Sequence, residues 1–384
     1  MYRYYSFLIV ALIIISLICC KENPVNKQEI IITTTDSCPH GNNEINCADE
    51  IQLGIVKKEK IETINDTDFF KFKINQAGVI EIAVENVPSN LIMDMRLYGS
   101  GQTEIAWATG NTYGSPVYQT YLGEPGQYYI RCKAINEDLD SINQYSLKVT
   151  LDTSDIYEIN NDISKSKTIQ LGKTIKGKIR PFYDIDFFTF VINTQGVLEI
   201  AVDTVPSDIK MQVILYNSQQ NIIENIVDSL YGHPIHSFTL QEKGNYYLQL
   251  NGESQSSNQF YAFRINLDSS DIYEINNSFS QAAEISLNTN IQGKIFPDCD
   301  IDIFKFTAST SGTYHIIVDP VPTELSINLY VYNSQFVYIN YSNNTTNGQP
   351  IYLDVDLTPG IYYLNLSERY CISSSQFYTL RINK

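Results

Sequence analysis

The chain has 384 residues, of which 43% are hydrophobic and 18% charged, so it is long enough for two or three domains and is not a disordered polyelectrolyte. Acidic residues outnumber basic ones by 43 to 26, and the formal net charge is −17. We therefore expect no nucleic-acid partner, because such a partner requires a basic face that replaces counterions on phosphates. The 28 Tyr and 17 Phe residues favour β structure, and only four His residues are available for catalysis.

The N-terminus has the pattern of a signal peptide, predicted over residues 1–19. A positively charged residue precedes an apolar run over residues 7–18, which is shorter than the roughly 20 residues of a membrane span. A Leu three positions before Cys20 and a small residue directly before it resemble a bacterial lipoprotein signal, so Cys20 is the predicted lipidation site. An ordinary secreted protein or an uncleaved helical anchor are the alternatives.

On the lipoprotein interpretation, residues 20–36 form a tether and the mature chain contacts the membrane only through its lipid anchor. We then expect an exported protein, held to a bacterial membrane at the cell surface or in the periplasm.

The rest of the chain repeats one unit three times, at offsets of 118 and 116 residues. The phrase Asp-x-Asp-(Phe/Ile)-Phe-x-Phe and the phrase Gly-x-Tyr-Tyr recur in order, beginning at Asp66 and Gly126, Asp184 and Gly244, and Asp300 and Gly360. A period of this length is the size of an independent domain rather than of a stacking repeat. We therefore predict three modules over residues 37–152, 153–268 and 269–384.

Each module has the pattern of an all-β domain. In the second copy Phe188, Phe190 and Ile192 alternate with more polar positions, and Gly, Asn, Ser or Asp separates such runs every 10–15 residues. This spacing predicts seven or eight short antiparallel strands per module, packed as a two-sheet, jelly-roll-like β-sandwich.

These phrases in this order resemble the bacterial pre-peptidase C-terminal domain, a β-sandwich found beside secreted proteases and as the collagen-binding module of clostridial collagenases. The resemblance extends from about residue 37 to the end of the chain. No peptidase domain accompanies it, so the resemblance implies a protein built only of accessory modules.

The resemblance also implies calcium ligands in the opening acidic phrase and in the Asp-x-Asp pair, because Ca²⁺ binds six to eight oxygens. Carried over by position, the candidate ligands are Glu158, Asn160, Asn161, Asp184 and Asp186 in the second copy, Glu274, Asn276, Asn277, Asp300 and Asp302 in the third, and Glu44, Asn46, Asp66 and Asp68 in the first. Ile156 and Ile272 stand where the family has its first acid, and Cys47 where an Asn or Asp is expected. The alternative is that these polar residues only cap turns and bond backbone N–H groups.

An exported chain permits disulfides. Cys38 and Cys47 are nine residues apart and are predicted to close a small ring, and Cys299 and Cys371 lie in one module and are predicted to pair. Cys132 is then left as a buried thiol.

The sequence predicts no enzyme, because no Gly-x-Ser-x-Gly elbow, His-Glu-x-x-His motif or phosphate-binding loop is present. The leading hypothesis is a lipid-anchored envelope or surface protein whose modules bind a protein or polysaccharide ligand. The alternatives are a structural or scaffolding envelope lipoprotein and, less favoured, a hydrolase with an unrecognised site. One Tyr of each Tyr-Tyr pair should face solvent, which marks a candidate ligand face.

Overall fold

The computed structural model describes residues 38, 40–63, 65–88, 91–110, 117–135, 144–227, 235–240 and 242–384. The predicted signal peptide over residues 1–19, the lipidation site Cys20 and the tether over residues 20–36 lie outside these ranges. None of the helices in the described ranges has the length and apolar character needed to cross a membrane.

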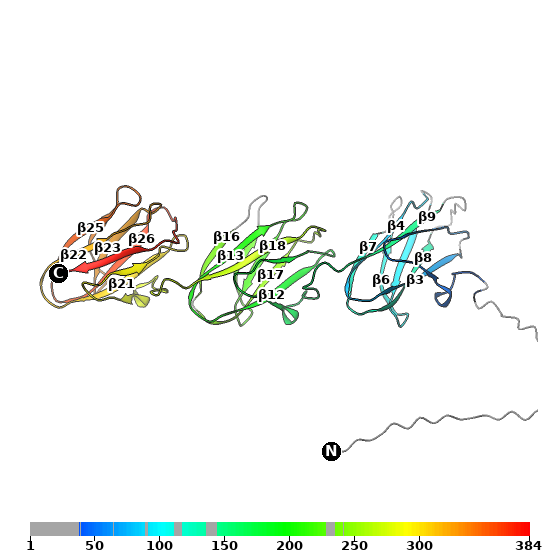
Figure 1. Ribbon diagram of the computed structural model, residues 1–384, viewed down its shortest axis with the longest axis horizontal. Helices are drawn as coiled ribbons and strands as arrows, with labels where there is room; N and C mark the ends of the chain where they lie inside the picture. The colour runs from blue at the N-terminus through cyan, green and yellow to red at the C-terminus, as the bar shows by residue number, and fades with distance from the viewer. Residues whose placement is uncertain are drawn as a thin grey trace, which may run out of the picture.

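Three β-sandwich modules follow one another in a row, and each consists of a five-stranded and a four-stranded sheet (Figure 1). The prediction of an all-β chain of tandem sandwiches is confirmed. The helical segments in the described part of the chain are three single 3₁₀ turns, η1 (Ile45–Cys47), η2 (Ile163–Lys165) and η3 (Phe279–Gln281).

The strands of the first module are β1 (Asp49–Glu50), β2 (Val56–Glu59), β3 (Thr67–Ile74), β4 (Gly78–Glu85), β5 (Met93–Tyr98), β6 (Glu104–Thr109), β7 (Val117–Leu122), β8 (Gly126–Ala134) and β9 (Tyr145–Asp152). They form one sheet in the order β1-β3-β8-β5-β6 and a second in the order β2-β9-β4-β7.

The strands of the second module are β10 (Lys167–Thr168), β11 (Ile175–Gly177), β12 (Ile185–Ile192), β13 (Gly196–Thr204), β14 (Gln212–Tyr216), β15 (Ile222–Val227), β16 (Ile235–Leu240), β17 (Gly244–Asn251) and β18 (Tyr261–Asp268). Those of the third module are β19 (Ala283–Glu284), β20 (Ile291–Gly293), β21 (Ile301–Ala308), β22 (Gly312–Val318), β23 (Ile327–Asn333), β24 (Tyr338–Asn343), β25 (Ile351–Leu357), β26 (Gly360–Glu368) and β27 (Tyr378–Asn383). Both modules repeat the two strand orders of the first.

These strand orders are those of a jelly roll, as predicted. The structure differs in having nine strands per module instead of seven or eight, and in the first strand, which pairs in parallel with the third. That first strand has only two residues, too few to show the alternation by which a strand is recognised in a sequence.

Alternating side chains build each core. Phe188 and Phe190 on β12 are fully buried between the sheets, while Phe187 and Thr189 lie partly exposed on the outer face. The Tyr-Tyr pairs alternate in the same way, so Tyr362 is buried and Tyr363 lies on the outer face of the third module. Each module therefore has its own apolar core, and its outer sheet faces are free to differ.

The cysteines lie where the sequence predicted them. Cys38 is bonded to Cys47 and Cys299 to Cys371, with Cα–Cα distances of 5.6 and 4.0 Å. Cys132 is a buried free thiol on β8, and burial raises its pKa above the usual range of a thiol.

Candidate functional site

A cluster of carboxylates, the second-module centre, lies where the second module begins. Oxygens of Glu158, Asp184 and Asp186 lie within 4.8 Å of one another. Asp184 follows a turn whose backbone bond runs from the Asp184 N–H to the Pro181 carbonyl, and Asp186 is the first inward-facing residue of β12. Glu158 comes from the segment that links the first two modules. The turn and the linking segment thus bring three acids together at one end of the sandwich.

Hydrogen bonds fix the carboxylates of this centre but leave several oxygens without partners. Asp184 accepts bonds from the backbone N–H of Arg180 and the amide of Asn161, both at 2.8 Å. The Tyr261 hydroxyl donates to Asp186 at 2.6 Å. The buried oxygens without a hydrogen-bond partner are Glu158 Oε1 and Oε2, Asn160 Oδ1 and Asp186 Oδ1.

The third-module centre repeats this arrangement. Oxygens of Asp271, Glu274 and Asp302 lie within 4.8 Å of one another, and the Tyr378 hydroxyl donates to Asp302 at 2.6 Å. The backbone N–H of Phe296 donates to Asp300 at 3.0 Å. The buried oxygens without a partner are Glu274 Oε1 and Oε2, Asn276 Oδ1, Asn277 Oδ1, Asp300 Oδ1 and Asp302 Oδ1.

Burial dominates the electrostatics of both centres. It raises the pKa of Glu158 and of Asp184 to about 8, with mutual repulsion between the carboxylates as the next cause. In the third module burial raises the pKa of Glu274 to about 9 and that of Asp300 to about 6. Carboxylates held this close at neutral pH need either protons or a bound cation to neutralise them.

The donor set of each centre fits a hard metal cation. Apart from the amide nitrogen of Asn276, the buried unpartnered atoms of the two centres are carboxylate and amide oxygens, which are the ligands that hard divalent cations prefer. The two members of the Asp-x-Asp pair and the Glu-x-Asn phrase predicted from the sequence come together in both modules. The acidic clusters can therefore bind a metal.

Sequence reasoning missed two members of these centres. Asp271 restores an acid one residue before Ile272, which points to solvent. Asp155 holds the same position in the second module, but it accepts bonds from the backbone N–H groups of Tyr157 and Lys178 and lies outside the three-acid cluster. The closing-strand residues Tyr261 and Tyr378 hold the inner Asp of each pair. A Tyr recurs about 75 residues after the inner Asp, and this recurrence is the sequence signal from which the Tyr–Asp bond could have been predicted.

The alignment predicted for the first module is wrong at its opening phrase. Glu44 precedes η1 just as Asp162 precedes η2, so Glu44 and Asn46 correspond to Asp162 and Ser164 and not to metal-site residues. Both side chains are exposed, and Asn46 accepts a bond from Gln102.

The Asp-x-Asp pair of the first module keeps its predicted position. Asp68 is buried and accepts a bond from Tyr145 at 2.6 Å, and burial raises its pKa to about 7. Asp66 accepts a bond from the backbone N–H of Glu62 at 2.6 Å. Within the described residues, the three-acid clusters belong to the second and third modules.

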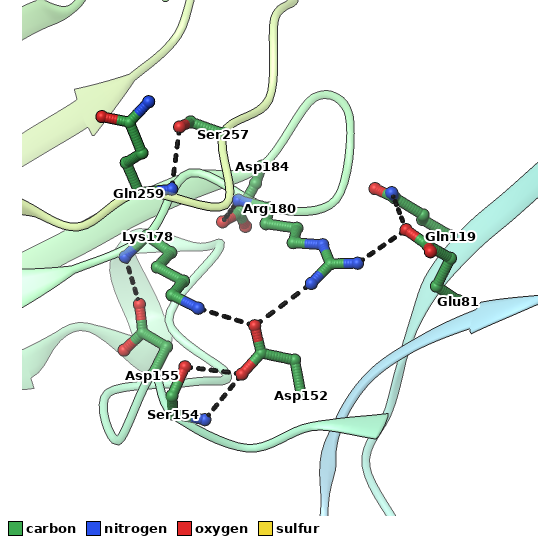
Figure 2. A network of polar contacts seen from close by, with 10 residues as sticks. All are labelled: Glu81, Gln119, Asp152, Ser154, Asp155, Lys178, Arg180, Asp184, Ser257 and Gln259. Carbon is green, nitrogen blue, oxygen red and sulfur yellow. Dashed lines mark hydrogen bonds and ion pairs between the residues drawn. The ribbon is translucent and has the colours of Figure 1, made fainter. Parts of the chain in front are cut away.

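A polar network joins the first two modules (Figure 2). Arg180, which is 8% exposed, donates to Glu81 on β4 at 2.8 Å and to Asp152 on β9 at 3.1 Å. Lys178 also donates to Asp152, at 2.7 Å. Although burial alone would raise it, bonds from Lys178 and Ser154 hold the pKa of Asp152 below its usual range. We call the contacts of Arg180 with Glu81 and Asp152 the Arg180 bridge.

This network borders a cavity of about 280 Å³ that also reaches the second-module centre. Its lining includes Val79 and Tyr121 from the first module, and Asp155, Glu158 and Arg180 from the second. Metal binding at the second-module centre would therefore take place next to the contact between two modules.

The second junction is built differently. Lys294 pairs with Asp268 at 2.6 Å, as Lys178 does with Asp152. Phe296 stands where the second module has Arg180, and among the described residues no ion pair corresponds to the Arg180 bridge. The space there, about 410 Å³, is lined by residues of both modules, including Glu199, His236 and Phe296.

The outer face of the five-stranded sheet in the third module carries a cluster of exposed and half-buried rings. We call this cluster, formed by Phe279, Tyr330, Tyr332, Phe336, Tyr338, Tyr341 and Tyr363, the aromatic face. Tyr330 stacks on Tyr341 with ring centroids 5.9 Å apart. Phe336, Tyr338 and Tyr341 are each at least half exposed.

A polar group lies among these rings. Asn365 on β26 is opposite Tyr330 in the strand register, and its Oδ1 has no hydrogen-bond partner. The aromatic face thus offers flat apolar area and phenolic hydroxyls, whereas the Asn365 amide oxygen is buried.

The corresponding face differs in each module. The cross-strand pair Tyr330–Tyr341 is replaced by Arg96–Trp107 in the first module and by Ile214–Asn225 in the second. In the first module Arg96 and Arg131 pair with Asp94, so this face is charged around an exposed Trp107. Three copies of one scaffold therefore present three different surfaces.

The fold defines a tandem β-sandwich protein. The family model described as the bacterial pre-peptidase C-terminal domain matches residues 184–252, which run from the Asp-x-Asp pair of the second module to the end of its β17 strand. The resemblance predicted from the sequence is thus confirmed in that module. No curated protein matches the chain.

Solved structures similar to parts of the chain include three of interest. The pre-peptidase C-terminal domain of collagenase from Bacillus anthracis is 22% identical, with 26% of this chain and 93% of that one covered and a TM-score of 0.23. The CBM22-1–CBM22-2 tandem domain of Paenibacillus barcinonensis Xyn10C is 13% identical, covering 50% and 81%, with a TM-score of 0.18. The secreted serine protease VesC from Vibrio cholerae is 10% identical, covering 72% and 62%, with a TM-score of 0.21.

Proposed function

We propose that this chain is a non-enzymatic, lipid-anchored binding protein of the bacterial envelope, composed of three pre-peptidase C-terminal modules. The observation that carries the binding function is the aromatic face, because solvent-exposed stacked rings are unfavourable unless a partner covers them. A protein that acted only as a spacer would need no such face. Its ligand is an extended polymer, a polysaccharide or a fibrous protein, that lies across the Tyr330–Tyr341 pair.

Binding to immobilised polymers tests this function. The probes are a panel of insoluble polysaccharides and fibrillar collagen, and the protein is the chain from residue 37 onward. We expect retention on one class of polymer and a loss of affinity of about tenfold or more for Tyr330→Ala/Tyr341→Ala, since central aromatic residues dominate binding energy.

The control for this variant is Ile214→Ala/Asn225→Ala, which changes the same register positions of the second module. It should leave retention within about twofold. Equal loss in both variants, or no loss in either, would contradict the assignment of the ligand face.

We further propose that the second- and third-module centres each hold one calcium ion. Glu158, Asp184 and Asp186 would hold the ion in the second module, and Asp271, Glu274 and Asp302 in the third, together with the nearby Asn oxygens. The ion would neutralise the buried carboxylates and fix the segment that enters each module. It would have no catalytic role.

The anchor is proposed from the sequence of residues 1–20. Cys20→Ser should abolish incorporation of labelled fatty acid and release the protein from the membrane fraction. Protease treatment of intact cells distinguishes the two locations, because a surface protein is degraded whereas a periplasmic one is protected.

A further inference from the structure

The Cys38–Cys47 disulfide encloses the stretch of the first module that corresponds to the metal-binding phrase of the other two. The correspondence is set by one backbone bond that all three modules share. The N–H groups of Phe69, Phe187 and Ile303 donate at 2.9 Å to the carbonyls of Asn42, Asn160 and Asn276, respectively.

At this offset Cys38 and Cys47 correspond to Ile156 and Lys165 of the second module. The ring of ten residues, 38–47, thus spans the positions of Glu158, Asn160 and Asn161.

The first module lacks the equivalent of Glu158, one of the three acids of the second-module centre, and the equivalent of the neighbouring acid Asp155. At the same offset of 118, Ser37 and His40 stand where the second module has Asp155 and Glu158. His40 is exposed. With its amide oxygen and nitrogen exchanged, the orientation that satisfies both groups, Asn43 donates to Asp66 at 2.8 Å, as Asn161 does to Asp184, so the polar frame remains. Two carboxylates and a His are a poor match for a cation that prefers many oxygens.

The ring and the cation would act on the same piece of chain. In the second and third modules the ion would join the opening segment to the first long strand of the sandwich. In the first module η1 is the last part of the ring, and the chain passes from Cys47 through Ala48 into β1, the short strand that pairs with β3. A disulfide that closes a loop restricts the conformations of that segment without any ligand.

We infer that the Cys38–Cys47 disulfide replaces the cation in the first module, so that oxidation fixes its opening segment whereas calcium fixes those of the other two. This inference rests on the calcium sites proposed for the second and third modules. It assigns the first module, the one next to the predicted tether, a fixed structure that does not depend on the calcium concentration.

Hydrogen exchange read by mass spectrometry on the chain from residue 21 tests the inference. Wild type is compared with Cys38→Ser/Cys47→Ser, and Cys299→Ser/Cys371→Ser is the matched control because it removes the other disulfide. Each protein is measured in calcium and in a calcium chelator.

In the wild type, chelation should raise exchange about tenfold or more at residues 156–168 and 272–284 and leave residues 40–50 unchanged. Cys38→Ser/Cys47→Ser should raise exchange at residues 40–50 by a similar factor in both conditions, and the control should not. A third variant, His40→Glu in the Cys38→Ser/Cys47→Ser background, should regain protection at residues 40–50 when calcium is added.

Two kinds of result would overturn the inference, and they differ in whether the proposed calcium sites fail as well. If residues 40–50 respond to calcium in the wild type, or do not respond to loss of the disulfide, the inference alone fails. If residues 156–168 and 272–284 do not respond to calcium, the proposed calcium sites fail and the inference fails with them.

Discussion

Replacing Arg180 by Phe should loosen the first junction and leave the modules folded. Arg180→Phe gives the second module the residue that the third has at the same position, Phe296. It removes two bonds that cross the junction, to Glu81 and Asp152. The perturbation thus converts one natural junction towards the other.

The free-energy cost of losing the Arg180 bridge follows from how deeply its three side chains are buried. The Arg180 side chain is 9% exposed, but Glu81 and Asp152 are 29% and 22% exposed and can regain water when it is lost. The cost should lie between that of an exposed pair and that of a fully buried one, about 2 kcal/mol. A change of this size shifts the ratio of open to closed junctions about 30-fold.

Electron-spin distance measurements provide the assay. Labels on Glu104 and Asn225 report the first junction, and both sites are on exposed surface. We expect a narrow distance distribution in the wild type and a broad one in Arg180→Phe. Arg264→Phe is the control, because Arg264 forms its ion pair with Asp203 inside the second module. An unchanged distribution in Arg180→Phe would refute the reasoning.

Further predictions concern the second-module centre. Without calcium, the stability of the second module should fall as the pH rises. The pKa of Glu158 and of Asp184 is about 8 in the folded state, above the unfolded values of 4.5 and 3.8, so the folded state binds more protons. The stability that these protons contribute is fully present below about pH 4 and is lost by about pH 8. Calorimetry in a chelator should show this fall and calcium should reduce it, whereas a flat profile would contradict the burial of the carboxylates. Tyr261→Phe should destabilise the second module by about 2 kcal/mol, because it removes a buried hydrogen bond to Asp186. Tyr216→Phe removes a more exposed hydrogen bond, to Gln249, and should cost less. Denaturant unfolding followed by hydrogen exchange at β12 measures both, and equal effects would contradict the role of Tyr261 in holding Asp186.

The sequence was sufficient for the fold because its signals are local and repeated. Phe188 and Phe190 alternate with outer residues along one strand, and the same pattern returns at a fixed offset. The two-residue strand β10 carries no such signal. Its parallel pairing with β12 is decided by the path of the chain into the module, which no periodicity records.

The candidate centres were only partly predictable. The Asp-x-Asp pair was found because it recurs at a fixed offset in all three modules and because the family resemblance marks it as a ligand pair. The first-module phrase was misplaced because the letters Glu44-Ile45-Asn46 match those of Glu158-Ile159-Asn160, although the offset of 118 leads instead to His40. A fixed offset was the more reliable guide than a short identical string.

The aromatic face was not predictable as a unit. The sequence indicates that one Tyr of the Tyr362-Tyr363 pair faces outward, but not which rings join it. Phe279 comes from η3 and Tyr330 and Tyr341 from neighbouring strands, and only the register of β23 with β24 and β26 brings them together. Pairing register depends on long-range contacts that a single sequence does not display.

Native mass spectrometry of the chain from residue 21, titrated with calcium, tests most directly the claim that the buried carboxylate clusters are cation centres. We predict two bound ions per chain, one fewer in Asp186→Asn or Asp302→Asn, and no change in Asp203→Asn, whose carboxylate pairs with Arg264 away from both centres. A chain that binds no calcium, or that binds the same number in all three variants, would contradict the account.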